Sequence, residues 1–536
     1  MLRQVLGRAA AAGTSLKVLT EAGIIRPYSP MVLAGMARAL RQWGTGPAGG
    51  FAALAIRSPH QIGLIDELGS LTYGELHRRS NSLARALADL GVSEGDGVAV
   101  MCRNHRGFVD ASVAIAKLGA DILYLNTAFA GPQLVDVLER EKPTAVIHDE
   151  EFSDLLAEAE MKHRVVAWTD SDVEGDTVES LIAGCPDDDL DPPARHARVV
   201  ILTSGTTGTP KGAPRNEAGI EAAVSLLSRM PLRHGWRTHI AAPLFHTWGF
   251  AHLAMAMLLG STVVLRRRFD PEECLKVTES ERCDSLAVIP VMLQRIMALP
   301  EDSLRKYDLS RVKVVAASGS ALPGDLALDW MDHFGDNLYN IYGSTEVAYA
   351  SIATPVDLRE APSSAGRPPW ATVVKILDPD GNEVRQGEPG RIFVGNGLLF
   401  EGYTGGGHKE VVDGLMSSGD VGRIGDDGRL YVEGRDDEMI VSGGENVFPK
   451  EVEDCLARHA AVAEVAAIGV DDDDYGKRLK AFVSLKAGES ATEDDLKGWV
   501  KKNLARYKIP REIVFLDELP RNATGKVLKK DLVDHD

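Results

Sequence analysis

One stretch of the chain, TSGTTGTPKGA at residues 203 to 213, gathers hydroxyl side chains, glycines and a lysine in a short segment. Hydroxyl groups and the N–H groups of glycine backbone can donate hydrogen bonds to a phosphate, and Lys211 adds a positive charge. The segment is not the loop of nucleoside triphosphatases, because Pro210 and Gly212 stand where that loop has its second glycine and its magnesium-binding hydroxyl. Taken alone, it is equally consistent with a simple turn. The residues that could contact a phosphate are Thr203, Ser204, Gly205, Thr206, Thr207, Gly208 and Lys211.

A second stretch, NIYGSTE at residues 340 to 346, also combines groups that suit a nucleotide. Tyr342 could stack on an adenine ring, Gly343 follows it, and Thr345 could donate to a phosphate. Glu346 offers the hard oxygen ligand that Mg²⁺ prefers. The alternative is a junction between a strand and a turn, with a solvated glutamate.

Three more side chains could take part in phosphate or carboxylate chemistry. Asp420 in SSGDVG could accept hydrogen bonds from both hydroxyls of a ribose, or could form an Asx turn. Lys526 in RNATGKVLKK could stabilise charge on reacting phosphate oxygens, or belong to a solvated basic tail. His246 lies in the aromatic stretch PLFHTWGF, where a core histidine is the ordinary interpretation.

Six of these stretches follow one another in a recognisable order. They are TSGTTGTPKG, PLFHTWG (243–249), NIYGSTE, SGD (418–420), GRDDEMIVSGGENVFPKEVE (434–453) and PRNATGKVLK (520–529). Together they resemble the motifs of the acyl-adenylate-forming superfamily, which contains acyl-CoA synthetases, luciferases and nonribosomal adenylation domains. One departure is that the family usually has an aromatic residue and a threonine where this chain has Met416, Ser417 and Ser418.

The resemblance implies an enzyme that cleaves ATP to AMP and pyrophosphate, with Mg²⁺ and coenzyme A. It implies that Lys526, brought in by a moving domain, stabilises the charge of adenylation, and that His246 lies beside the acyl carboxylate. It places Asp420 and Arg435 at the ribose and makes Asp437 the hinge. The remaining positions that it implies are Gly443 and Gly444 near the pantetheine tunnel, Gly319 and Ser320 near the adenine and the acyl chain, and Phe245 and Trp248 in an apolar tunnel, with Trp248 as a wall or a gate.

The segments that would position these residues alternate between short apolar runs and helical patterns. GVAVMCRN, ADILYLN, TAVIHDE, RVVAWTD, RVVILTSG, SLAVIP and KVVAASGS predict buried strands, and YGELHRRSNSLARALADLG predicts a helix between strands. This alternation predicts an α/β fold with largely parallel sheets, whose sites lie at the carboxyl ends of the strands.

The expected domains are a large N-terminal domain over residues 1–434, a hinge at 435–438 and a small, mobile α+β domain over 439–536. Within the large domain, residues from about 370 to 434 contain short strands punctuated by glycine and aspartate, which predicts a small β-rich subdomain. Residues 1–50 form a basic extension.

Charge and cysteine usage limit the partners. The net charge of −19 repels a phosphate backbone and argues against nucleic acid. Five scattered cysteines without a CxxC pair indicate neither a disulfide framework nor a zinc site, which fits a reducing cytoplasm. No run of 18 apolar residues predicts a membrane span. In the basic extension, MVLAGMARALRQW predicts a helix that packs on its own domain, with peripheral membrane contact as the open alternative.

From the resemblance we predict a fatty-acid–CoA ligase of the actinobacterial type. Three alternatives remain open: an aryl- or sterol-acid–CoA ligase, a fatty-acyl-AMP ligase that loads a carrier protein, and a catalytically silent adenylate-binding sensor. The sensor should have lost Lys526 or Glu346, and both are present. The expected partners are the acid and coenzyme A, and a homodimer is compatible with the sequence.

Overall fold

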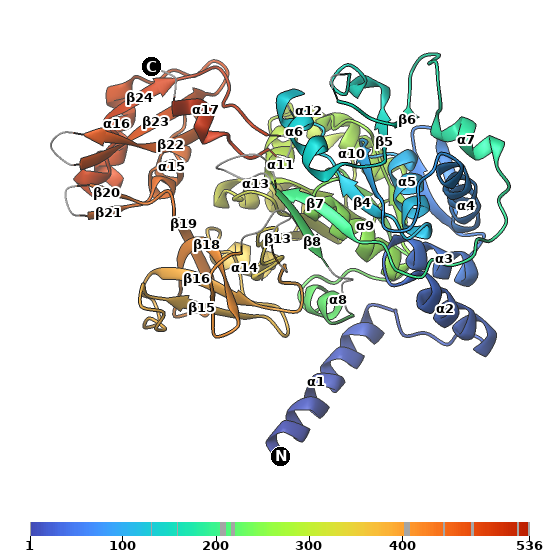
Figure 1. Cartoon of the computed structure of the whole chain (residues 1–536). Helices are drawn as coiled ribbons and strands as arrows, with labels where there is room; N and C mark the ends of the chain where they lie inside the picture. Colours follow the sequence, from blue (N-terminus) through green and yellow to red (C-terminus); the bar gives the residue numbers. More distant parts are fainter. Residues whose placement is uncertain are drawn as a thin grey trace.

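The computed structural model describes residues 2–533 except for 130, 158, 204–210, 216–219, 401, 403–407, 443–444, 473–475 and 523–524. It has a mixed α/β fold with a large N-terminal and a small C-terminal domain, as the sequence predicts (Figure 1). The predicted strand segments are all found as strands, and the predicted helix is α4 (Tyr73–Asp89). A capping box of Thr72 and Glu75 defines the start of α4.

Two largely parallel sheets form the large domain. The first has the order β6-β5-β3-β4-β7-β8, and only β8 runs antiparallel to its neighbour. Its strands are β3 (Gly97–Met101), β4 (Asp121–Tyr124), β5 (Ala145–Asp149), β6 (His163–Trp168), β7 (Val199–Thr203) and β8 (Lys211–Arg215).

The second sheet has the order β14-β13-β12-β11-β9-β10-β1-β2, with antiparallel strands only at its two edges. Its strands are β1 (Ile62–Asp66), β2 (Gly69–Thr72), β9 (Arg237–Ile240), β10 (Thr262–Val264), β11 (Ser285–Val288), β12 (Val314–Ala317), β13 (Leu338–Tyr342) and β14 (Ser351–Ala353). Strands β9, β11 and β12 are almost entirely buried, which agrees with their apolar sequences.

Helices cover and connect these sheets. They are α1 (Leu2–Glu21), α2 (Pro30–Trp43), α3 (Pro47–Arg57), α4, α5 (Arg106–Lys117), α6 (Gly131–Glu141), α7 (Val178–Gly184), α8 (Ile220–Leu227), α9 (Thr247–Leu259), α10 (Pro271–Ser280), α11 (Pro290–Met297), α12 (Glu301–Arg305), α13 (Gly324–Phe334) and α14 (Pro355–Glu360). The helix α2 lies where MVLAGMARALRQW predicts one, and Ala39 and Trp43 on its inner side are buried.

Two smaller antiparallel-rich sheets follow. The first, in the segment predicted to be β-rich, contains β15 (Val373–Leu377), β16 (Gly390–Gly395), β17 (Val411–Val412), β18 (Leu415–Ile424) and β19 (Leu430–Arg435). The second belongs to the C-terminal domain and contains β20 (Ile440–Ser442), β21 (Glu445–Val447), β22 (Val462–Asp472), β23 (Gly476–Leu485) and β24 (Glu512–Phe515), with helices α15 (Pro449–Ala457), α16 (Glu493–Asn503) and α17 (Lys529–Val533). Figure 1 shows this C-terminal domain beside α11 and α13 of the large domain.

No helix among the described residues is long and apolar enough to cross a membrane.

Candidate active site

The carboxyl ends of three neighbouring parallel strands form the base of the site. Strands β11, β12 and β13 pair in register, so the residues that follow them lie along one edge of the sheet. These residues are Ile289 after β11, Ser318 to Ser320 after β12 and Gly343 after β13. Gly319 has a φ of +98°, which favours glycine at this turn. A site at this edge agrees with the general position of ligands in open α/β sheets.

A hydrogen-bonded trio joins this edge to the β-rich sheet. The hydroxyl of Tyr342 donates a short hydrogen bond to Asp420 and lies 3.2 Å from the Ser418 hydroxyl. Arg435 Nη1 donates to the other oxygen of Asp420 at 3.2 Å. Asp420 lies inside β18 and pairs with Arg435 on β19, so the alternative interpretation of Asp420 as an Asx turn is wrong.

Burial changes the pKa of both acidic groups in this trio. It raises the pKa of Asp420, against the opposing effects of Tyr342 and Arg435. Burial and the neighbouring Asp420 carboxylate raise the pKa of the Tyr342 hydroxyl, which therefore remains a hydrogen-bond donor at neutral pH. Tyr342 and Arg435 together fix the orientation of the Asp420 carboxylate.

Arg435 also connects the trio to the turn between β19 and β20. Its Nε donates to Asp437 Oδ1 at 3.1 Å, and Asp437 is exposed. Residues 436 to 438 form a turn, which is the segment that the sequence predicts as the hinge. The predicted ribose contact and the predicted hinge residue are thus direct neighbours.

Lys526 projects from a tight loop of the C-terminal domain. The backbone of Asn522 and that of Lys526 hydrogen-bond at 2.9 Å, and the Asn522 side chain accepts from the Lys526 N–H at 2.9 Å. Arg521 donates to Gly525 O at 2.5 Å and to Glu464 at 2.9 Å, which ties the loop to β22. The described residues on either side of 523–524 are therefore held in place by their own domain.

The charge of Lys526 interacts electrostatically with two residues of the trio. Burial and Arg435 lower the pKa of Lys526, while Glu438 and Asp420 act in the opposite direction. Since two residues of the trio act electrostatically on Lys526, the structure brings a residue of the C-terminal domain together with the nucleotide-type residues of the large domain. The resemblance implies a juxtaposition of this kind during adenylation.

The loop fits closely against the first turn of α11. An added Cβ at Gly525, whose φ is +75°, would lie 2.3 Å from Val291 Cγ1 and 3.3 Å from Ile289 Cδ1. On the same helix, Gln294 Nε2 donates to Ala463 O of β22 at 3.2 Å. Close packing at Gly525 and this hydrogen bond hold the C-terminal domain against α11.

The segment after Tyr342 is constrained by its backbone. An added Cβ at Gly343 would lie 2.1 Å from Ala348 O, so no other residue fits there. The Ser344 hydroxyl donates to Glu346 at 2.8 Å, and Thr345 and Glu346 are both half-buried. Mg²⁺ commonly binds through one or two carboxylates plus substrate phosphates and water, so the single partly exposed carboxylate of Glu346 fits this ion.

Aromatic residues surround His246 at the start of α9. Phe245 and Trp248 are buried, and the Trp248 indole donates to Val288 O of β11 at 2.9 Å. Trp248 also packs edge-to-face on His252, with ring centroids 4.4 Å apart. Burial lowers the pKa of His246 to about 4, so its imidazole is neutral at physiological pH. The contacts with Val288 and His252 hold the Trp248 ring in its position in α9.

Several predicted residues cannot be placed. Ser204, Gly205, Thr206, Thr207 and Gly208, together with Gly443 and Gly444, lie outside the described residues. For Thr203 and Lys211 the structure gives only the backbone pairing of β7 with β8, in which these two residues are directly opposite each other.

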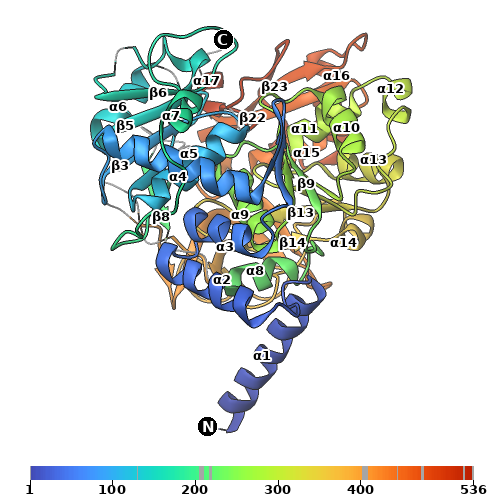
Figure 2. The same cartoon turned by 90° about the vertical axis from the view of Figure 1, so that its right-hand side faces the viewer.

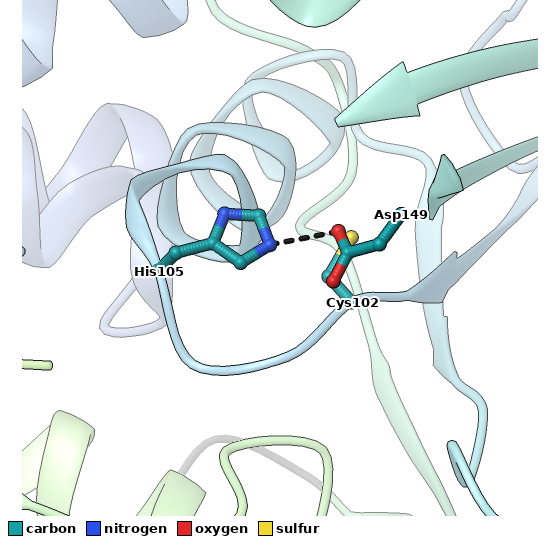
Figure 3. Close-up of side chains that lie close together, drawn as sticks. All are labelled: Cys102, His105 and Asp149. Carbon is teal, nitrogen blue, oxygen red and sulfur yellow. Dashed lines mark hydrogen bonds and ion pairs between the residues drawn. The ribbon is translucent and has the colours of Figure 1, made fainter. Parts of the chain in front are cut away.

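A second group of polar residues lies in the six-stranded sheet. Among the described residues, only Cys102, His105 and Asp149 lie close enough together to share a metal ion, and all three are buried (Figure 3). His105 Nε2 donates to Asp149 at 2.7 Å, and its Nδ1 accepts from Gly107 N at 3.0 Å, which caps α5.

The remaining ligand atoms of this group are also in use. Asp149 Oδ2 accepts from Arg103 N at 2.9 Å, and burial together with Asp149 raises the pKa of the Cys102 thiol. Because a metal would require the Cys102 thiolate and would displace these hydrogen bonds, we interpret the group as a structural junction of β3, α5 and β5.

Surface hollows lie elsewhere. One of about 800 Å³ lies between α12 and α13, and one of about 510 Å³ lies at the ends of β5 and β6. Neither is lined by Tyr342, Asp420, Arg435 or Lys526.

Sequence reasoning missed two residues that the structure places at the site. Neither ring nitrogen of the buried His252 has a hydrogen-bond partner among the described residues. Arg521 shapes the Lys526 loop through Glu464, which is 57 residues away in sequence. Arg521 lies inside the PRNATGKVLK motif, so the motif could have drawn attention to Arg521. Nothing in the sequence indicates that Glu464 is its partner.

Comparison with known proteins gives matches over most of the chain. Residues 51–404 match the model of the AMP-binding enzyme family, and residues 451–526 match that of the AMP-binding enzyme C-terminal domain. A feruloyl-CoA synthase of Amycolatopsis sp. is 34% identical over 89% of this chain and 96% of its own length. A 2-succinylbenzoate–CoA ligase of Geobacillus sp. (strain WCH70) is 32% identical over 89% of this chain and 95% of its own. The crystal structure of an anthranilate CoA ligase with anthranoyl-AMP has a TM-score of 0.83 and 26% identity, covering 91% of this chain and 96% of that one.

Proposed function

Because this chain belongs to the AMP-binding enzyme family, we propose that its site joins a carboxylic acid with an apolar body to coenzyme A through an acyl-adenylate. The protein is an enzyme of the AMP-forming acid–thiol ligase class. The observation that carries the proposal is the close packing of Gly525 on α11, which brings Lys526 where Asp420 and Arg435 act on it electrostatically.

In the first step a carboxylate oxygen of the acid attacks the α-phosphorus of ATP. The new bond is an acyl–phosphate bond, and the bond to the leaving pyrophosphate breaks. Negative charge then accumulates around the α-phosphoryl oxygens, and a preorganised cation such as Lys526 stabilises that charge in the transition state. Bound Mg²⁺ supplies charge neutralisation of the phosphates, and Glu346 would hold it.

Asp420 is suited to bind the ribose. Tyr342 and Arg435 hold its carboxylate in place, so a ribose hydroxyl would meet an acceptor that needs no reorganisation. The position of Tyr342 at the end of β13 suits adenine contact, and Thr345 follows on the same segment as a phosphate donor. The hydroxyl- and glycine-rich loop that begins at Thr203 remains our candidate for the polyphosphate.

In the second step the thiol of coenzyme A attacks the acyl carbon, a thioester forms and AMP leaves. We propose that the C-terminal domain turns about Asp437 between the steps, so that Gly443 and Gly444 approach the pantetheine. Asp437 is the exposed residue of the turn at 436 to 438, and its contact with Arg435 supports this role.

The acid is recognised by an apolar wall. His246 is neutral, so it can donate or accept a hydrogen bond at the acyl carboxylate. Phe245 contacts His246 edge-on, Trp248 donates to Val288 O, and Gly319 lies beside the next residue, Ile289. Fatty acids, which an apolar tunnel bordered by Phe245 and Trp248 would suit, are the first candidates. Ring-bearing acids are the second, and they are favoured by the fixed position of Trp248 and by the aromatic acids in the names of the feruloyl and anthranilate relatives.

A panel of acids tests the substrate class. Pyrophosphate release and acyl-CoA formation would be measured with saturated fatty acids of increasing length, with cinnamates and benzoates, and with amino acids and dicarboxylates as controls. Rates that rise with chain length support the fatty-acid candidate, and rates that are highest for cinnamates or benzoates support the ring-bearing one. A preference for amino acids or dicarboxylates would contradict the proposal that an apolar wall recognises the acid.

A further inference from the structure

The three N-terminal helices form a separate layer of the molecule. Figures 1 and 2 both show α1 extending away from the body, with α2 and α3 packed at its base. The C-terminal domain lies at the other end of the molecule in Figure 1, so this layer is not part of the site described above.

Helix α2 uses only one side for packing. Ala39 and Trp43 are buried, and Met36 and Leu40 pack against the same hydrophobic core. These four residues form the apolar stripe with which a surface helix normally packs on its domain, so packing does not require further apolar residues on the other side of α2.

The outer side of α2 is also apolar in part. Met31 is 83% exposed and Leu33 is 49% exposed. Ile56, at the end of α3, is 41% exposed and lies beside the same helix, because an added Cβ at Gly35 would be 3.0 Å from Ile56 Cγ2. Three large apolar side chains are therefore offered to solvent at one end of the α2–α3 pair.

Arginines accompany these apolar side chains. Arg38 and Arg41 lie on the exposed side of α2, and Arg26 is exposed just before it. We call Met31, Leu33, Arg38, Arg41 and Ile56 the N-terminal face. No acidic residue stands between Glu21 and Asp66 in the sequence.

The charge of this segment is opposite to that of the rest of the chain. Residues 1–57 contain seven basic residues and one acidic residue, whereas the remainder contains 52 basic and 77 acidic residues. The N-terminal segment thus has a net charge of +6 on a body of −25. An anionic surface would attract this face and repel the rest, which fixes the orientation of docking.

From these observations we infer that the N-terminal face docks the enzyme on the surface of a bilayer that contains anionic lipids. Met31, Leu33 and Ile56 would enter the interface between headgroups and acyl chains, while Arg38 and Arg41 would contact the lipid phosphates. A symmetric dimer through the same face would bring Arg38 and Arg41 close to their own copies, and like charges oppose that arrangement. Nucleic acid would satisfy the arginines but would leave the exposed apolar side chains in water.

Co-sedimentation of the full-length enzyme with vesicles tests the inference. We expect binding to vesicles of phosphatidylcholine and phosphatidylglycerol, little binding to phosphatidylcholine alone, and a loss of binding as salt is raised. The double variant Arg38→Glu/Arg41→Glu should bind the anionic vesicles at least tenfold more weakly. The variant Leu33→Ser should weaken binding several-fold without changing its dependence on salt.

The matched control is Lys501→Glu/Lys502→Glu, which makes the same change of charge on the exposed last turn of α16 in the C-terminal domain. It should bind the anionic vesicles as the wild type does. Rates with a water-soluble acid should be equal in all variants, since no substituted residue lies in the site.

Three results would overturn the inference: no binding by the wild type, equal binding to neutral vesicles, or equal losses in the control. A wild-type dimer in sedimentation velocity that dissociates in Arg38→Glu/Arg41→Glu would instead make this face a contact between two copies, which also overturns it. None of these outcomes depends on whether the proposed acid–CoA ligation is correct.

Discussion

Replacing Gly525 by alanine should impair adenylation through a steric contact between the two domains. The new Cβ would lie 2.3 Å from Val291 Cγ1 on α11, a distance that requires either Val291 or the loop to move. The positive φ of +75° adds backbone strain that is present wherever the C-terminal domain lies. Only the contact with Val291 depends on docking of the loop.

The size of the effect follows from these two contributions. Overpacking a close contact costs about 1–3 kcal/mol, which corresponds to a loss of roughly 5- to 150-fold in the rate of a step that needs the docked loop. The strain at positive φ, on the order of 1–2 kcal/mol, should lower the stability of the C-terminal domain in both steps. Adenylation should therefore fall by roughly one to two orders of magnitude more than thioester formation.

Two half-reactions separate these contributions. Adenylation is measured as pyrophosphate release in a single turnover, and thioester formation is measured from a supplied acyl-adenylate and coenzyme A. Gly525→Ala should slow the first far more than the second.

A compensating substitution provides the control. Val291→Ala removes Cγ1, so the double variant Gly525→Ala/Val291→Ala should recover most of the lost adenylation, whereas Val291→Ala alone should change it little. If the two half-reactions lose equally and the double variant recovers nothing, the contact at α11 is not what Gly525 is needed for.

Substitutions at four further residues test the proposed roles and one contribution to stability. Lys526→Ala should reduce adenylation by two or more orders of magnitude but spare conversion of a supplied acyl-adenylate, and equal losses in both would make Lys526 structural. In the wild type, adenylation should fall with rising pH below the usual pKa of lysine, because burial and Arg435 lower the pKa of Lys526. Asp437→Pro should spare single-turnover pyrophosphate release and slow thioester formation. Asp437→Ala loses the same contact with Arg435 but leaves the backbone free to rotate, so it should slow thioester formation less. Wild-type rates of both steps in Asp437→Pro would refute the role of Asp437 as the hinge. Trp248→Ala should alter the preference for acid size more than the KM for ATP. Unchanged relative rates across the acids would show that Trp248 does not line the acid-binding region. Burial lowers the pKa of His252 to about 4, so only the unfolded state takes up a proton at this residue as pH falls from about 6.5 to about 4, and stability is lost in that window. His252→Phe should therefore reduce the loss of unfolding free energy between about pH 8 and about pH 5 by roughly 2 kcal/mol. Urea titrations that give equal losses in the wild type and the variant would contradict this.

The sequence predicts the local elements well and their long-range pairing poorly. Apolar runs such as those of β3, β5 and β12 predict strands because their periodicity is local. The pairing of β1 with β10, which joins Leu64 to Val263, depends on packing of segments about 200 residues apart and leaves no local signal.

The same division holds in the site. The motifs identify Tyr342, Asp420 and Arg435 as residues that could bind a nucleotide, but not that Tyr342 and Arg435 orient Asp420. The aromatic stretch around Trp248 suggests an apolar environment, but it does not reveal that the indole donates to Val288 O on another element. Contacts of this kind depend on which strands become neighbours, so residue types and spacing alone do not reveal them.

Product analysis of a complete turnover tests the central claim most directly. With ATP, Mg²⁺, coenzyme A and an apolar acid, chromatography should show AMP, pyrophosphate and acyl-CoA in equal amounts, and an acyl-adenylate when coenzyme A is omitted. Release of ADP and phosphate, or ATP consumption without any acyl-adenylate or thioester, would contradict the account.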